Sequence, residues 1–230
     1  MDAQGSRVKA AFLVTSAIRT DLGSYDAATR LHQTFATIAS IRQRVRGAQI
    51  ALLELSATAL DEEWIDQLSA RVDWFVTLSH PLLDDMRGLS CSPRTIKSVT
   101  ELACLHLFLG HAAQANLLAD ADRVFKLSGR YVLTEDFELA HFDAPGRYVF
   151  KHAHALQHSP RLWSFDSALL GDAHSRLGKM LADCTDALAG HAQVDIGVML
   201  QRHVPADLKR TIAMLGLQGY PGSLGELIID

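Results

Sequence analysis

The first half of the chain alternates short apolar runs with longer amphipathic stretches, and this alternation limits the folds open to it. Residues 8–15 and 50–55 are almost continuously apolar, as strands buried on both faces are. Between them, residues 26–45 place large apolar side chains every three or four positions, the period of a helix with one buried face. We therefore predict an α/β fold with a mostly parallel central sheet flanked by helices.

The same signals predict further elements along the chain. Pro93 directly follows Ser92 and suits the first turn of a helix. Glycines spaced three apart mark residues 216–225 as a loop, and the apolar residues Leu224 to Ile229 predict that this tail packs on the body of the protein rather than forming a mobile lid. We predict strands at 74–78, 124–125, 131–133, 148–152 and 161–165, and helices at 61–68, 93–119, 169–188 and 206–215.

Length and composition exclude several classes of protein. The 230 residues fit one domain, and the net charge of −4 gives no overall attraction to nucleic acid. Cys91, Cys104 and Cys184 are scattered and lack metal-binding spacing, which is typical of a reducing cytoplasm. No stretch of about 18 uninterrupted apolar residues occurs, and the first residues lack the apolar run of a signal peptide. We expect a cytoplasmic protein with no transmembrane segment.

The segment from Phe125 to Tyr131 carries the densest group of candidate binding residues. It reads Phe-Lys-Leu-Ser-Gly-Arg-Tyr, directly after an apolar strand candidate, and ligands of α/β sheets lie at the carboxyl ends of strands. Lys126 and Arg130 are suited to neutralise phosphate, and Gly129 lets a ligand approach the backbone. We predict a donor-binding role for Lys126, Ser128, Gly129, Arg130 and Tyr131; the alternatives are a solvated β-turn and, for Tyr131, a core position.

Two other places supply polar side chains that suit the same site. Thr15, Ser16 and Arg19 follow the first strand, where they either contact a nucleotide or cap the next turn. Lys97 lies in the first turn of its helix, where the helix dipole disfavours a cation. A bound anion relieves this conflict, and so does an ion pair with Glu101 one turn later.

The order of these features resembles that of GT-A-like nucleotide-sugar glycosyltransferases, especially those of bacterial and phage surface-polysaccharide synthesis. The resemblance rests on segments 12–18, 37–42, 50–56, 97–101, 124–131 and 161–166. It implies a Rossmann-like half, about 1–135, that binds a nucleoside-diphosphate sugar, and an acceptor-side half, about 136–230. It also implies an enzyme that transfers the sugar to a glycan or a lipid-linked glycan.

The chain departs from that family at its metal motif. The family usually carries Asp-x-Asp after the middle strand, where this sequence has Lys126-Leu127-Ser128. Asp120 and Asp122 have the spacing but precede the strand, which places them at the wrong end of the sheet. We therefore expect Lys126 and Arg130 to neutralise the diphosphate without a metal cofactor, while a divalent metal stays an alternative.

Candidate catalytic bases are acidic residues in the second half. Inverting transfer needs a base to deprotonate the acceptor hydroxyl, and Asp195, Asp166 and Asp136 are the candidates in that order, each with a helix cap or turn as its alternative role. Retaining transfer needs no such base. His152, His154 and His158 form a tight group with no cysteine or carboxylate at zinc-site spacing, so we do not expect a metal cluster there. One of them facing an acceptor sugar is an alternative.

The sequence thus predicts a glycosyltransferase that uses a nucleoside-diphosphate sugar. A non-catalytic binding or scaffold protein with the same donor pocket is the alternative. An unrelated nucleotide-binding α/β protein is a third interpretation, against which the lack of a Gly-x-Gly-x-x-Gly motif and of a P-loop argues.

Overall fold

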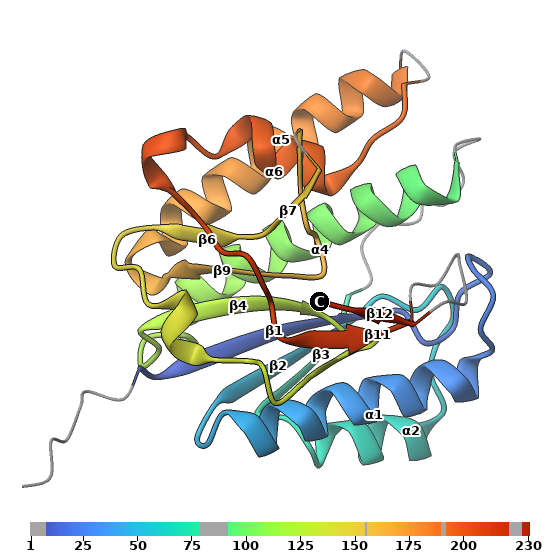
Figure 1. The fold of residues 1–230 in the computed structure, drawn as a ribbon. Coiled ribbons are helices and arrows are strands. Elements are labelled where there is room, and N and C mark those ends of the chain that lie inside the picture. The colour runs from blue at the N-terminus through green and yellow to red at the C-terminus, as the bar shows by residue number, and fades with distance from the viewer. Residues whose placement is uncertain (1–7, 79–91, 155, 190–191, 221–226) are drawn as a thin grey trace, which may run out of the picture.

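The centre of the protein is a seven-stranded sheet in the order β10-β6-β9-β4-β1-β2-β3 (Figure 1). The computed structural model describes residues 8–78, 92–154, 156–189, 192–220 and 227–230. The strands of this sheet are β1 (Ala10–Ser16), β2 (Gln49–Glu54), β3 (Trp74–Thr77), β4 (Arg123–Ser128), β6 (Tyr148–Phe150), β9 (Leu162–Asp166) and β10 (Lys209–Thr211).

Most neighbouring strands of this sheet are parallel. β1 pairs in parallel with β2 and β4, β2 with β3, and β6 with β10. β9 alone in this sheet runs the other way, antiparallel to both β4 and β6. The predicted α/β sheet with mostly parallel strands is therefore confirmed. Because β1, β2 and β4 run together, their carboxyl ends meet at one edge.

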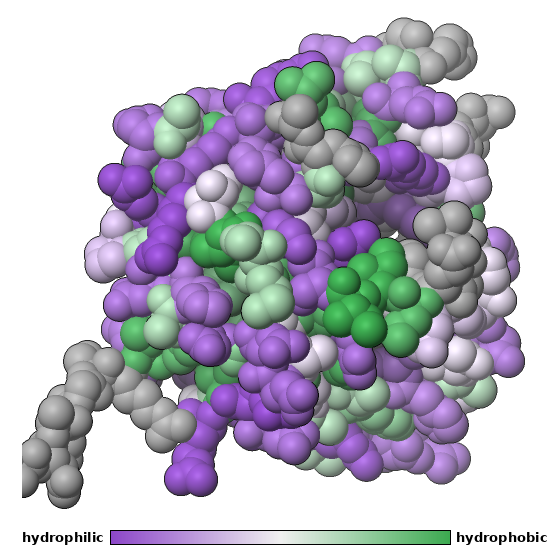
Figure 2. Space-filling model, in the orientation of Figure 1, coloured by the Kyte–Doolittle hydropathy of each residue, from purple (hydrophilic) through white to green (hydrophobic). Residues whose placement is uncertain are grey.

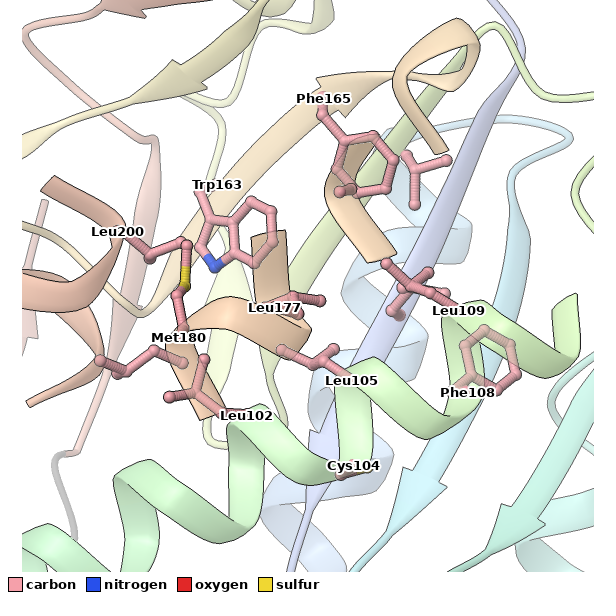
Figure 3. Packing of buried hydrophobic residues seen from close by; sticks show 14 of the residues in the cluster. Leu102, Cys104, Leu105, Phe108, Leu109, Trp163, Phe165, Leu177, Met180 and Leu200 are labelled. Atoms are coloured by element: carbon pink, nitrogen blue, oxygen red, sulfur yellow. The ribbon is translucent and has the colours of Figure 1, made fainter. Parts of the chain in front are cut away.

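Helices cover both faces of the sheet (Figure 1). α1 (Ala27–Arg44) and α2 (Glu62–Ser69) lie on one face, and α4 (Pro93–Ala115), α5 (Leu170–Ala189) and α6 (Ile196–His203) on the other. Side chains alternate between these faces along each strand. Phe12 and Phe125 therefore stack on the α1 side, while Trp163 and Phe165 pack with Leu105 of α4 on the other (Figure 3).

Smaller elements surround the central sheet. β11 (Leu217–Gly219) pairs antiparallel with β5 (Tyr131–Leu133) and with β12 (Ile228–Ile229). β7 (His152–His154) and β8 (Gln157–His158) form a separate hairpin. The 3₁₀ turns are η1 (Leu139–Phe142), η2 (Ser167–Leu169) and η3 (Ala206–Leu208).

The predicted helix at 206–215 is wrong. Only residues 206–208 form a 3₁₀ turn, and Lys209–Thr211 continue as β10 because they pair in parallel with Tyr148–Phe150 of the sheet. The helix predicted to end near residue 119 ends earlier, at Ala115, because Asn116 adopts a left-handed conformation with φ +56°. The helix continues through Gly110 without a break.

The C-terminal tail is paired where it is described. Residues 217–219, read from the sequence as part of a loop, form β11, which pairs with β5, and residues 228–229 form β12, which pairs with β11. The described part of the tail is therefore ordered, although Leu227 and Ile229, two of the residues expected to pack on the body, stay exposed. Gly222 and Leu224 lie outside the described residues. Figure 2 shows a compact apolar patch where β12 lies in Figure 1, and Leu227 and Ile229 are among the exposed large hydrophobic residues.

The helices of the described segments do not combine enough length and apolarity to cross a bilayer.

Gly216 supports the turn that leads into β11, and its replacement tests this part of the fold. Gly216 has φ +67°, and a Cβ there would lie 2.3 Å from the Phe137 amide nitrogen. We expect Gly216→Ala to lower the free energy of unfolding by roughly 2–4 kcal/mol, from backbone strain plus the clash. Gly146 has φ +64° and no atom within 4 Å of such a Cβ, so Gly146→Ala should cost only about 1 kcal/mol. Urea unfolding of both variants measures the difference, and equal losses would contradict the predicted clash.

Candidate functional site

A cavity of about 300 Å³ opens at the carboxyl ends of β1, β2 and β4. The chain continues from β1 to β2 in one direction across the sheet, whereas β4 lies on the other side of β1. The cavity therefore lies at the point where the strand order reverses, the usual ligand crevice of an open α/β sheet. Of the sequence-predicted donor residues, the cavity brings together Thr15, Ser16, Lys97, Ser128, Gly129 and Arg130.

Strand alternation decides which wall of the cavity each polar side chain joins. Thr15 and Ser128 pair across β1 and β4, and both hydrogen-bond on the α4 side of the sheet. Ser16 points to the α1 side, where its hydroxyl lies 3.0 Å from that of Thr34. Gly129 keeps the two strand ends close, because its amide donates to the Thr15 carbonyl at 2.8 Å.

Lys126 lies beneath the cavity rather than among its lining residues. Strand β4 continues to Ser128, past the predicted end at Phe125, so Lys126 turns into the layer between the sheet and α4. Its side chain is 0% exposed. The ammonium donates to the Ser128 hydroxyl at 2.8 Å and to the Pro160 carbonyl at 2.6 Å, and it forms an ion pair with Glu101. These three acceptors match its three N–H groups.

Glu101 links both strand ends to α4. The same carboxylate oxygen that faces Lys126 accepts a hydrogen bond from the Thr15 hydroxyl at 2.8 Å. Glu101 lines the cavity, and its side chain is 18% exposed. Burial lowers the pKa of Lys126, and the charge of Glu101 opposes that shift. The helix spacing suggested that Glu101 pairs with Lys97. In the structure Glu101 pairs with Lys126 instead.

Three basic side chains, Arg30, Lys97 and Arg130, line the cavity together. Burial lowers the pKa of Arg30 and of Lys97, and the nearby charge of Arg130 lowers both further. Within the described ranges, neither Lys97 nor Arg130 lies within ion-pair distance of a carboxylate. Like charges gathered in one cavity repel one another, and an anionic ligand would offset that repulsion.

Arg30 also shapes the loop that closes one side of the cavity. It is 5% exposed, and its guanidinium donates to the carbonyls of Tyr25 at 3.0 Å, Ala17 at 3.3 Å and Leu22 at 2.9 Å. Glu54, buried at the end of β2, holds the start of this loop by accepting from the Ile18 amide at 2.9 Å. Burial raises the pKa of Glu54.

Arg19 and Tyr131, two of the predicted donor residues, do not line the cavity. Arg19 pairs with Asp61, donates to the Ala59 carbonyl at 2.6 Å and lies 5.1 Å from the ring centre of Trp64. Tyr131 is 4% exposed and packs in the core on the α1 side.

The structure does not bring the acidic candidates into the cavity. In the register of β4 and β9, Asp166 lies opposite Arg123 at the amino end of β4. It is therefore at the opposite edge of the sheet, about 16 Å from Ser128 along a six-residue strand. It caps η2 by accepting from the Ala168 amide at 2.9 Å. Asp136 is exposed in a turn.

Asp195 lies at the same end of the molecule as the cavity but is held by other groups. It caps α6 by accepting from the amides of Gly197 and Val198 at 2.8 Å and 3.3 Å. Its other oxygen accepts from Arg94, which lies in the first turn of α4, one turn before Lys97. Gln157 donates to the capping oxygen Oδ1 of Asp195 at 2.8 Å.

The side chains at the end of β4 do not fit a divalent cation. Ser128 offers a hydroxyl and Arg130 a positive charge, whereas such ions prefer carboxylate oxygens. Among the described residues, two acidic side chains line the cavity: Glu101 is already paired with Lys126, and Asp21 is on the loop after β1. Asp122 accepts from the Lys9 amide at the amino end of β1, far from this edge. The described residues hold no group of three or more potential metal ligands.

Comparison with known proteins supports the predicted fold family. No protein-family model matches the sequence, and no curated protein does. Among solved structures, the galactosyltransferase LgtC, in complex with donor and acceptor sugar analogues, matches with a TM-score of 0.55 and 11% identity, over 87% of this chain and 72% of LgtC. Core-mannan synthase A of Aspergillus fumigatus, in its Mn/GDP form, matches with a TM-score of 0.54 and 8% identity, over 92% of this chain and 74% of that one. The chain has a GT-A glycosyltransferase fold.

In this GT-A fold, sequence reasoning did not assign to the site two charged helix residues that line the cavity, Arg30 and Glu101. Arg30 is buried and Glu101 is partly buried, each on a helix whose buried positions include both apolar and polar residues. Arg30 directly precedes the buried Leu31, and Glu101 precedes the buried Leu102. A charged residue among the inward positions of an amphipathic helix is the signal that would have found them.

The histidines at 152, 154 and 158 lie on the β7–β8 hairpin. His158 is 0% exposed and stacks on Phe150 with ring centres 4.2 Å apart, and His152 stacks on His158 at 4.9 Å. Burial, together with the nearby charge of Lys209, lowers the pKa of His158 to about 4. His158 is thus a neutral core residue at pH 7.

The lowered pKa of His158 predicts a pH-dependent stability. Its ordinary pKa is 6.5, so between pH 6.5 and about 4 the unfolded state binds the proton more tightly. The stability from a neutral His158 is full above pH 6.5 and falls as the pH drops. When the pH is lowered from 7.5 to 5, the free energy of unfolding of the wild type should fall by roughly 1–2 kcal/mol more than that of His158→Phe, as measured by urea unfolding. His111→Ala, which changes an exposed histidine, should keep the wild-type pH dependence. Equal losses in the wild type and His158→Phe would contradict this account.

Proposed function

We propose that this protein transfers a sugar from a nucleoside-diphosphate donor to a glycan acceptor, and that the cavity at the ends of β1, β2 and β4 is its donor site. The GT-A fold supports the general reaction class. A role in surface-polysaccharide synthesis and a lipid-linked acceptor follow from the sequence resemblance, and a cytoplasmic location follows from the cysteine pattern of the sequence. All three are part of the proposal.

The observation that carries the proposal is the group of three cations in the cavity. Arg30, Lys97 and Arg130 come from α1, α4 and the end of β4, three separate elements that the fold brings to one place. Lys97 and Arg130 have no carboxylate partner among the described residues, so their charge is available to a ligand. A diphosphate carries the opposite charge, and guanidinium groups bind phosphate oxygens in pairs.

These cations suit the leaving group of a glycosyl transfer. The bond between the anomeric carbon and the diphosphate oxygen breaks, the electron pair stays on the diphosphate, and the acceptor hydroxyl oxygen forms the new bond while losing its proton. Negative charge therefore grows on the departing diphosphate. Lys97 and Arg130, already in place beside it, stabilise that charge without reorganising. We propose that they supply the charge neutralisation that a metal supplies elsewhere.

The group that accepts the proton depends on the stereochemistry of the transfer. Asp195 lies nearer to the cavity than Asp166, but four donors already hold its two oxygens. The geometry favours a capping role for both residues. A retaining transfer, which needs no separate base, agrees with this placement.

The donor-site assignment predicts which substitutions remove nucleotide binding. We expect the protein to bind one nucleotide from a panel of uridine, guanosine, cytidine and adenosine diphosphates and their sugar-linked forms. Binding of this nucleotide should persist in the presence of EDTA. Arg130→Ala and Lys97→Ala should each weaken its binding roughly 10- to 100-fold, the loss expected for a hydrogen bond to a charged group. Isothermal titration measures these affinities.

Arg44→Ala is the matched control, because Arg44 is an exposed arginine in the last turn of α1, at the other end of that helix from Arg30. It should leave the affinity within about twofold of the wild type. Unchanged binding in both cavity variants would contradict the donor-site assignment. Binding without hydrolysis or transfer to any glycan would favour the alternative, a non-catalytic protein with the same fold.

A further inference from the structure

The ion pair beneath the cavity fixes the direction of two hydroxyl groups above it. The Lys126 ammonium donates to the Ser128 oxygen at 2.8 Å, and an ammonium has no lone pair with which to accept in return. The proton of the Ser128 hydroxyl is therefore free to point to another acceptor. Ser128 lines the cavity and is partly exposed, so this proton is available to a ligand there.

The opposite holds for Thr15 and Thr100. Thr15 donates its hydroxyl proton to Glu101 at 2.8 Å, and Thr100 donates its own to the Ile96 carbonyl of the same helix at 2.8 Å. Both residues line the cavity with their protons already used, so each has only lone pairs to offer a ligand. The partly exposed carboxylate of Glu101 adds a further acceptor on this side.

We propose that Lys126 and Glu101 are positioning residues that divide the floor of the cavity into a donor side and an acceptor side. Ser128, with Arg130, forms the donor side and binds phosphate oxygens. Thr15 and Thr100, with Glu101, form the acceptor side and bind hydroxyl groups of the ligand's sugar or ribose. The inference rests on the proposed function, since it takes the ligand to be a nucleoside-diphosphate sugar.

This division gives the ligand one preferred direction. Phosphate oxygens only accept hydrogen bonds, so they are repelled by the lone pairs of Thr15 and attracted by the proton of Ser128. Sugar hydroxyls donate, and they find acceptors at Thr15 and Glu101. Because Lys126 and Glu101 neutralise each other, the charges of Lys97 and Arg130 above them are left for the diphosphate.

Two ligands separate the two sides in a binding experiment. Inorganic pyrophosphate has only acceptors, whereas UDP-glucose and GDP-mannose also carry hydroxyls. Ser128→Ala should weaken pyrophosphate binding about tenfold. Thr15→Val should change pyrophosphate binding by less than about twofold, yet weaken the nucleotide sugar that binds best about tenfold, and Thr15→Ser should restore that affinity.

A double-mutant cycle tests whether Lys126 acts through Ser128. In a Lys126→Met background the Ser128 hydroxyl is no longer oriented, so adding Ser128→Ala should weaken pyrophosphate binding by about twofold or less instead of tenfold. A purely structural role for Lys126 would leave the effect of Ser128→Ala unchanged, and that result would overturn the positioning role. If Lys126→Met does not fold, the comparison of Ser128→Ala with Thr15→Val decides the inference.

Arg130→Ala, titrated with pyrophosphate in parallel, separates a failure of the two-sided floor from a failure of the donor site itself. If Arg130→Ala loses binding but Ser128→Ala does not, or if Thr15→Val loses as much as Ser128→Ala, the division into two sides is wrong and the donor site stands. If Arg130→Ala binds pyrophosphate as well as the wild type does, the proposed function fails too.

Discussion

The ion pair between Lys126 and Glu101 is the interaction on which the candidate site depends. It joins the centre of β4 to α4, and through Thr15 and Ser128 it reaches the ends of both β1 and β4. Removing one partner of a buried pair typically costs about 3–5 kcal/mol, because the other charge is left uncompensated. Three acceptors around one ammonium make this burial tolerable, and the same contacts orient the hydroxyls of the cavity floor.

The sequence was sufficient for the layers of the fold and for the edge at which the site lies. Buried parallel strands are continuously apolar, so β1 and β2 were recognisable, and polar residues directly after them marked the carboxyl edge. Lys126 was placed in the site itself, because a lysine is almost never buried and the strand was taken to end before it. Lys126 lies two residues after Val124, so in a strand both side chains are on the same face of the sheet. That face packs against α4, where Glu101 pairs with Lys126.

Other parts depended on long-range contacts that no local pattern contains. β10 exists because Lys209–Thr211 pair with β6, although the segment alone reads as a helix. Arg30 joins the cavity because the loop after β1 folds back over it and offers three carbonyls. Tertiary contacts determine the conformation of such residues and override their local secondary-structure propensity.

The positive charge of the proposed donor site comes from α1, α4 and the end of β4, which lie far apart in the sequence. Direct observation of a ligand in it is the sharpest test: a crystal structure of the protein with the nucleoside diphosphate that it binds. The account predicts phosphates within hydrogen-bonding distance of Arg130, Lys97 and Ser128, with Lys126 still paired to Glu101. A diphosphate bound elsewhere, or one in contact with a Lys126 that has left Glu101, would contradict it.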